Sequence, residues 1–261
     1  MRPTTHLLAS LAMTAAAVGC AFVLPVHAVA ASLTVISDDD DDAVVDARDD
    51  GPGVARTVGA FSKLRIDGSI DVDAHPGSHP GVTVHASKRI EPLIETVVEG
   101  DTLVVRLKRG VNYITFGHDD TRVDVEFAQL TGTQQRGSGD LHIRGLNTPR
   151  LESSIAGSGD LKMEGAQLGS FALRIEGSGD VAVDGKADEA RFSIDGSGDI
   201  AAEHLVARRV EVAIRGSGDA RVNATEALDA RVAGSGDVTY HGHPHQISRD
   251  VAGSGSVSAA D

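Results

Sequence analysis

The sequence predicts an all-β protein: a parallel β-solenoid (β-helix) with about 20 residues per coil and irregular N-terminal coils or a capping sheet. The main observation is a repeated tetrapeptide. Gly-Ser-Gly-Asp occurs six times, and a seventh copy ends in Ser. Successive copies start 20, 20, 19, 20, 18 and 19 residues apart, a spacing typical of coils that stack on one another. The copies lie at 137–140, 157–160, 177–180, 196–199, 216–219, 234–237 and 253–256.

Alternating apolar residues flank each copy and are the second observation. Around the third copy, Leu173 and Ile175 precede the first glycine, and Val181 and Val183 follow the aspartate. A spacing of two is the strand period, so each coil is expected to contain two short strands with one apolar face. A helical period fits nowhere in this stretch. A second, looser bend between the strands is expected to absorb the one- and two-residue deletions, and it often contains glycine: Gly145, Gly165, Gly185 and Gly242.

Stacking of the Gly-Ser-Gly-Asp corners would align their aspartates in one column. Glycine adopts the positive φ angles of a sharp corner, and Ser and Asp accept hydrogen bonds from turn amides. Carboxylates about 5 Å apart repel by about 1 kcal/mol in water and about 3 kcal/mol at an intermediate dielectric. Either backbone amides offset this repulsion, or metal cations such as calcium bind along the column. The residues concerned are Asp140, Asp160, Asp180, Asp199, Asp219 and Asp237.

The N-terminal region reads as an export signal followed by an acidic leader. Arg2 precedes an apolar run, and small residues near Ala28 favour a signal peptide over residues 1–30. Cys20, the only cysteine, offers a rival lipoprotein processing site that the sequence favours less. Residues 31–56 contain the run Asp38 to Asp42 and are expected to be a disordered leader. Residues 57–136 are expected to form the irregular β part, and residues 137–257 the regular solenoid.

Composition narrows the possible partners. The formal net charge of -14 opposes sequence-independent binding to nucleic acid, and no membrane span is expected in the mature chain. Aromatic residues make up 3% of the chain, which disfavours a flat aromatic platform for sugars. Polar contacts with a glycan, or binding of an envelope or extracellular protein, remain open. The final compartment would be the periplasm, the outer membrane or the cell surface.

Three histidines near the C-terminus form a second candidate metal site. On an extended strand, alternate side chains share one face and could bind zinc, copper or nickel. Pro244 and Gly242 favour a turn instead, which would separate the imidazoles. The residues are His241, His243 and His245.

The repeated corners with alternating strands, together with the ending 238–244 and 251–256, resemble the bacterial head GIN domain family, labelled putative autotransporter adhesins. The resemblance covers roughly residues 61–257. It implies an exported parallel β-solenoid with an adhesive or envelope role, and it supplies no catalytic residues.

Enzymatic activity is disfavoured by the regularity of the repeat. Some β-helix proteins cleave polysaccharides, but a catalytic carboxylate pair needs two different environments, and a repeated corner gives each Asp nearly the same one. No nucleophile motif or cofactor fingerprint occurs. The sequence therefore favours an exported, non-enzymatic binding, adhesion or structural module with no required cofactor. The alternatives are a calcium- or metal-linked periplasmic protein and, less favoured, a polysaccharide-acting enzyme.

Overall fold

The computed structural model describes residues 53–110 and 121–260. The signal peptide, Cys20 and the run Asp38 to Asp42 lie outside the described residues and stay predictions. Seventeen strands and one short 3-10 helix are present in the described part, and all the strands belong to one continuous sheet. The N-terminal elements are β1 (Val54–Arg56), β2 (Lys63–Gly68), β3 (Asp71–Pro76), β4 (Gly81–His85), η1 (Glu91–Leu93), β5 (Ile94–Glu99), β6 (Thr102–Leu107), β7 (Arg122–Phe127), β8 (Gly132–Gly137) and β9 (Leu141–Arg144). The later strands are β10 (Asn147–Gly157), β11 (Leu161–Gly177), β12 (Val181–Gly196), β13 (Ile200–Gly216), β14 (Ala220–Gly234), β15 (Val238–His241), β16 (Gln246–Gly253) and β17 (Val257–Ala259).

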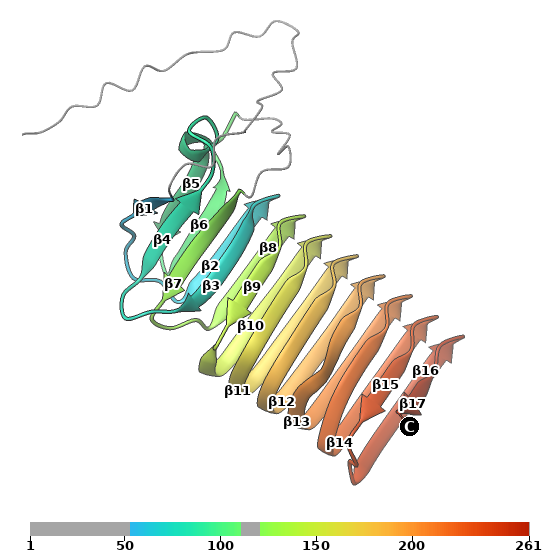
Figure 1. Cartoon of the computed structure of the whole chain (residues 1–261). Coiled ribbons are helices and arrows are strands. Elements are labelled where there is room, and N and C mark those ends of the chain that lie inside the picture. Colours follow the sequence, from blue (N-terminus) through green and yellow to red (C-terminus); the bar gives the residue numbers. More distant parts are fainter. Residues whose placement is uncertain (1–52, 111–120, 261) are drawn as a thin grey trace, which may run out of the picture. The chain divides into compact units, whose positions relative to one another are not determined.

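The long strands β10 to β14 stack in parallel, each bent strand pairing with the next along the chain (Figure 1). Glycine pairs with glycine at every corner, as in Gly177↔Gly196 and Gly196↔Gly216. There are about six turns, spaced about 20 residues apart. This confirms the predicted parallel β-solenoid.

Alternate residues of each coil point into a narrow apolar core. The column two residues before the corner glycine contains Ile155, Ile175, Ile194 and Ile214, each at most 1% exposed. Phe171 and Phe192 lie in adjacent columns of neighbouring coils, and their rings meet edge-on with centroids 5.8 Å apart. The alternation of apolar and polar residues in the sequence therefore corresponds to the alternation of core-facing and surface-facing side chains.

In the Gly-Ser-Gly corners, the stacking requires both glycines. The first has a positive φ, 139° at Gly177, which side chains rarely tolerate. The second approaches the coil before it so closely that a Cβ on Gly179 would lie 2.2 Å from the carbonyl oxygen of Gly159. The corner is thus a backbone-on-backbone contact.

The second bend of each coil absorbs the differences in coil length, as expected. The register between β11 and β12 shifts between Met163 and Ala166, whereas the corner glycines stay paired. The β12–β13 and β13–β14 pairs also shift at this bend.

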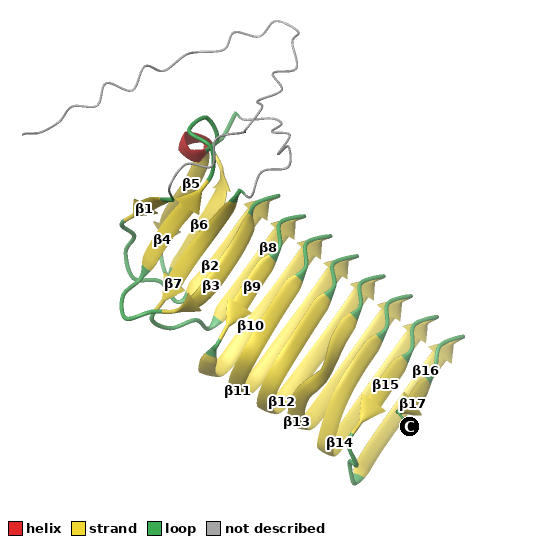
Figure 2. Ribbon diagram, viewed as in Figure 1, coloured by secondary structure: helices red, strands yellow, loops and turns green. Residues whose placement is uncertain are grey.

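The N-terminal coils do not follow the order of the chain. Strands β2 and β3 form a coil that lies between β6–β7 on one side and β8–β9 on the other. The outermost coil therefore comes later in the chain than the coil it covers. Strands β4 and β5 pair antiparallel with β7 and β6, and β1 pairs antiparallel with β4, so this end carries a small antiparallel sheet (Figure 2).

Strand β1 lies within the segment that the sequence assigned to the disordered leader. Its Arg56 donates hydrogen bonds to the carbonyl oxygen of Ile94 at 2.7 Å and to Oγ1 of Thr96 at 3.2 Å, and it forms an ion pair with Glu91. These long-range contacts order residues 54–56, so within the described residues the ordered part begins before position 57.

Candidate functional site

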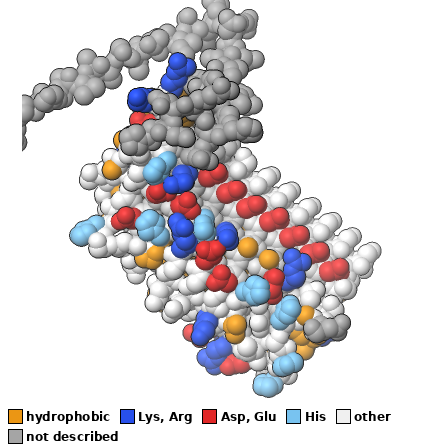
Figure 3. Space-filling view, viewed as in Figure 1, with side chains coloured by type: hydrophobic (Ala, Val, Ile, Leu, Met, Phe, Trp, Pro, Cys, Tyr) orange, Lys and Arg blue, Asp and Glu red, His pale blue; other side chains and the backbone are white. Residues whose placement is uncertain are grey.

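The corner aspartates form a hydrogen-bonded column along one edge of the solenoid. The Oδ1 atom of Asp160 accepts a hydrogen bond of 2.8 Å from the backbone amide of Asp180, and Asp180 accepts one of 2.8 Å from Asp199. The same contact recurs through Asp237, whose carboxylate accepts both the amide and the hydroxyl of Ser256. Backbone capping, one of the two alternatives from the sequence, is therefore present. Figure 3 shows the acidic side chains as a row that follows the corners.

The column contains a further member that the sequence reading missed. Asp71 accepts a hydrogen bond of 2.9 Å from the amide of Asp140, 69 residues away in the chain. Its corner is Gly68-Ser69-Ile70-Asp71, and Gly68 pairs with Gly137. A search for Gly-Ser-x-Asp with the same apolar offsets, Ile66 before and Val72 after, would have found it.

The column does not by itself form a cage for a metal ion. Only Oδ1 of each carboxylate takes part in the interactions between described residues, and among those residues no three His, Cys, Asp or Glu side chains converge as metal ligands. Calcium needs six to eight oxygen ligands. A bound cation would therefore have to take most of its ligands from water, and calcium binding stays a prediction.

A groove of about 710 Å³ runs beside the column. It lies on the face formed by the residues that follow each corner, which we call the post-corner face, and reaches from the coil of Asp71 to that of Arg221. Pairing aligns one outward residue per coil along this face: His142, Lys162, Ala182, Ala201 and Arg221. The two alanines form a low apolar floor between Lys162 and Arg221, beside the acidic column. Figure 3 shows hydrophobic and basic side chains next to the row of acidic ones.

Charged residues crowd the N-terminal end of the groove. His142 lies between two carboxylates, with Nδ1 3.2 Å from Asp73 and Nε2 3.2 Å from Glu164. Nε2 of His142 is within hydrogen-bond distance of Glu164, but the angles are not those of a hydrogen bond. This nitrogen is therefore buried without a hydrogen-bond partner among the described residues. Lys162, followed by His142, lowers the pKa of the Glu164 carboxyl. The carboxyl of Glu164 is therefore ionised at neutral pH.

The opposite face, formed by the residues before each corner and here called the pre-corner face, carries ion pairs between coils. Arg191 donates to Glu211 at 2.6 Å, and Arg231 donates to the same carboxylate at 3.1 Å. Arg191, and then Arg231, lower the pKa of Glu211, and Glu211 raises that of Arg191. Arginine and acid thus neutralise one another here, whereas none of the ion pairs between described residues involves a corner aspartate, which is capped by backbone amides instead.

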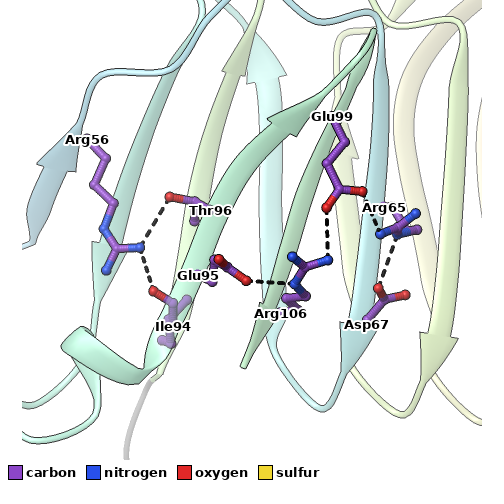
Figure 4. Close-up of polar contacts among 8 residues, drawn as sticks. All are labelled: Arg56, Arg65, Asp67, Ile94, Glu95, Thr96, Glu99 and Arg106. Atoms are coloured by element: carbon purple, nitrogen blue, oxygen red, sulfur yellow. Dashed lines mark hydrogen bonds and ion pairs between the residues drawn. The ribbon is translucent and has the colours of Figure 1, made fainter. Parts of the chain in front are cut away.

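The N-terminal cap has an ion-pair network of its own (Figure 4). Arg106 of β6 donates to Glu95 at 2.7 Å and to Glu99 at 3.0 Å, and Glu95 raises its pKa most strongly. Arg65 of β2 reaches Glu99 at 3.2 Å and Asp67 at 3.1 Å. The network joins β2, β5 and β6, so it holds the cap onto the first coil.

The three histidines do not share a strand. His241 ends β15, His243 lies in the following bend at Gly242 with φ 85°, and His245 precedes β16. The amide of His245 donates to the carbonyl oxygen of Glu226 at 2.9 Å. The expected zinc, copper or nickel site would therefore have to form across a bend, and it stays a prediction.

Fold and corners together define a class: a parallel β-solenoid whose coils turn on paired glycines and are joined by a column of aspartates. The chain belongs to the family described as putative auto-transporter adhesin, head GIN domain, whose model matches residues 60–244. No curated protein matches the chain in sequence. Among the described residues, no helix has the length and apolar character needed to cross a bilayer.

Several solved structures share the fold. A putative adhesin from Bacteroides fragilis is 26% identical with a TM-score of 0.76, and the alignment covers 80% of this chain and 96% of that one. A putative lipid binding protein from Parabacteroides distasonis is 26% identical with a TM-score of 0.67, covering 83% and 99%. A putative adhesin from Parabacteroides merdae, 19% identical with a TM-score of 0.60 over 80% and 96%, shows the fold alone.

Proposed function

We propose that the protein is an exported, non-enzymatic binding or adhesion module of the bacterial cell envelope. The observation that carries the proposal is the equivalence of successive coils: the corner aspartates repeat one contact at 2.8 Å from Asp140 to Asp237. A surface of this kind suits repeated contacts with an extended partner. It does not suit a catalytic pair, which needs two carboxylates in unlike surroundings.

The groove on the post-corner face is the surface we assign to binding. It combines an acidic edge, the basic side chains of Arg122, Lys162 and Arg221, and a floor of small residues at Ala182 and Ala201. A partner lying along it would offer basic groups to the aspartate column and apolar or polar groups to the floor. An envelope or extracellular protein, or a glycan bound through polar contacts, fits this description.

Crosslinking in cells tests both the compartment and the surface. A photo-crosslinking residue at Ala201 should yield an adduct in the envelope fraction, whereas one at Ala213, on the other face of the same strand, should not. Ala201→Trp should reduce the adduct of a crosslinker at Ala182, and Ala213→Trp should not. A mature protein found only as a free periplasmic monomer without adducts would overturn the proposal.

Calcium binding at the aspartate column is the second candidate. It is motivated by the column of carboxylates that have only Oδ1 engaged among the described residues. If amide capping alone offsets the repulsion, millimolar calcium and a chelator should leave the melting temperature unchanged. An increase with calcium that disappears in Asp180→Asn would support the metal-linked alternative.

Lipid binding, the activity in the name of one similar structure, is less well supported here. The large hydrophobic residues that are exposed among those described lie on β1, β13 and β16, and none of them lines the groove. They are Val54, Val206, Ile247 and Val251.

A further inference from the structure

The last described coil leaves one end of the solenoid open. Strand β16 pairs with β14 and β17 with β15, and within the described residues nothing pairs with their other edges. Every residue of β16 is exposed. A free strand edge of this length is a template for pairing with another chain.

The inward positions of this coil are the ones that would meet such a chain. Pairing places Ile247, Arg249 and Val251 over Leu228, Ala230 and Val232, which are all buried. Ile247 and Val251 are 43% and 41% exposed. Two of the three positions are therefore apolar and available, and the central one is charged.

Arg249 lies across the end of the core. Its guanidinium carbon is 5.1 Å from the centroid of the Tyr240 ring. The guanidinium donates to the Tyr240 hydroxyl, and its Nη1 donates to the carbonyl oxygen of Val257 at 3.3 Å. These contacts tie β16 to β15 and β17 and favour the charge at this point through the aromatic face.

A second copy docking end to end would have to bury this charge. If two β16 strands pair antiparallel, inward residues face inward residues. When Ile247 faces Val251 of the other copy, the two Arg249 side chains meet; a shift by two residues places Arg249 against Ile247 or Val251 instead. Each register buries either like charges or an unpaired charge, both of which are unfavourable.

We propose that Arg249 closes the C-terminal end of the solenoid to a second copy of the chain. It acts as an inward-pointing charge that stops strand pairing from continuing beyond β16. Ile247 and Val251 are exposed to a similar degree and face each other when two β16 strands pair antiparallel. Without the charge of Arg249, the favoured partner for this free edge is therefore the same edge of another molecule.

The test compares oligomeric states by analytical ultracentrifugation. Arg249→Val should convert a monomer into a dimer, with self-association at least about tenfold tighter than in the wild type. Arg249→Lys keeps the charge and should stay monomeric. Arg231→Val, a matched loss of arginine on the pre-corner face of β14, should also stay monomeric.

The site of contact is tested by a second substitution. Ile247→Asp in the Arg249→Val background should restore the monomer if dimers form through β16. If Arg249→Val does not fold, Arg249→Met, which can still pack on Tyr240, replaces it. A folded, monomeric Arg249→Val or Arg249→Met variant would overturn the proposal, as would a wild-type dimer that Ile247→Asp dissociates.

Discussion

The carboxylate of Asp160 accepts a hydrogen bond of 2.8 Å from the backbone amide of Asp180, one coil further along the solenoid. Asp180 in turn accepts the amide of Asp199. Each aspartate is therefore both an acceptor for the next coil and a donor to the one before. The contact sets the register of neighbouring corners and places a partial positive charge beside each carboxylate, which offsets the repulsion within the column.

The first prediction separates the hydrogen bond from the charge at Asp180. Asp180→Ala removes the acceptor of the Asp199 amide and is expected to lower the free energy of unfolding by about 1 kcal/mol. Asp180→Asn keeps an acceptor oxygen and removes one of the like charges, so its stability should be at or above that of the wild type. Urea unfolding followed by circular dichroism measures both. An Asn variant as unstable as the Ala variant would contradict the capping role.

The second prediction concerns the close approach of the corners. Gly179→Ala places a Cβ 2.2 Å from the carbonyl oxygen of Gly159, so the two coils must separate. We expect a loss of about 3 kcal/mol of stability. Gly59→Ala is the matched control, because a Cβ there meets nothing within 4 Å and φ is not positive. Equal melting temperatures for the two variants would contradict the proposed packing.

The third prediction concerns a buried glutamine. Gln135 is 2% exposed and lies in a core column between Ile66 and Ile155. Its Nε2 donates to the carbonyl oxygen of Asp160 at 2.8 Å, but its Oε1 has no partner among the described residues.

Gln135→Ile removes this unpaired oxygen and continues the apolar column. The carbonyl of Asp160 keeps a hydrogen bond of 2.9 Å from the Leu141 amide. We expect stability to rise by about 1 kcal/mol, and Gln135→Ala to lower it by leaving a cavity. If thermal unfolding shows that Gln135→Ile is as destabilised as Gln135→Ala, the glutamine contributes more to stability than its hydrogen bonds indicate, and the prediction is wrong.

The fourth prediction is a pH dependence on the pre-corner face. Arg191, followed by Arg231, lowers the pKa of Glu211 from its usual 4.5. Because the pKa in the folded state is below that in the unfolded state, the contribution to stability is complete above pH 4.5 and is lost as the pH falls through the folded-state value. The side chain is partly exposed, so we expect less than about 1 kcal/mol.

Glu211→Gln should remove this part of the acid sensitivity. Its melting temperature should fall less steeply than that of the wild type below pH 4.5, and the two proteins should converge in about 0.5 M salt because exposed pairs are screened. Parallel pH profiles at low salt would show that the pair contributes nothing measurable.

Much of the regular solenoid could be predicted from the sequence, since its determinants are local. Alternation at residues such as Leu173, Ile175 and Val181 marks strands, and paired glycines mark corners that tolerate no Cβ. The candidate site was only partly predictable. The aspartate column follows from the period, but the groove depends on small residues at Ala182 and Ala201 that stand side by side only once the coils are in register.

The order of the N-terminal coils could not be read locally. The corner at Gly68 stacks on that of Gly137, and the intervening residues supply the coil and the antiparallel sheet on its other side. No sequence pattern predicts which edge of a strand a later segment will pair with. That choice depends on which free edge and apolar surface remain to be covered when the coils meet.

The chain by itself thus determined the strand period, the corners and the coil length, because alternation and glycine backbone freedom act over a few residues. Only the tertiary structure decided that the corner of Asp71 stacks directly on that of Asp140 and that Arg249 lies over Tyr240 at the end of the core. Both relationships arise from contacts between coils, where a side chain's partner is set by stacking and not by its neighbours in the sequence.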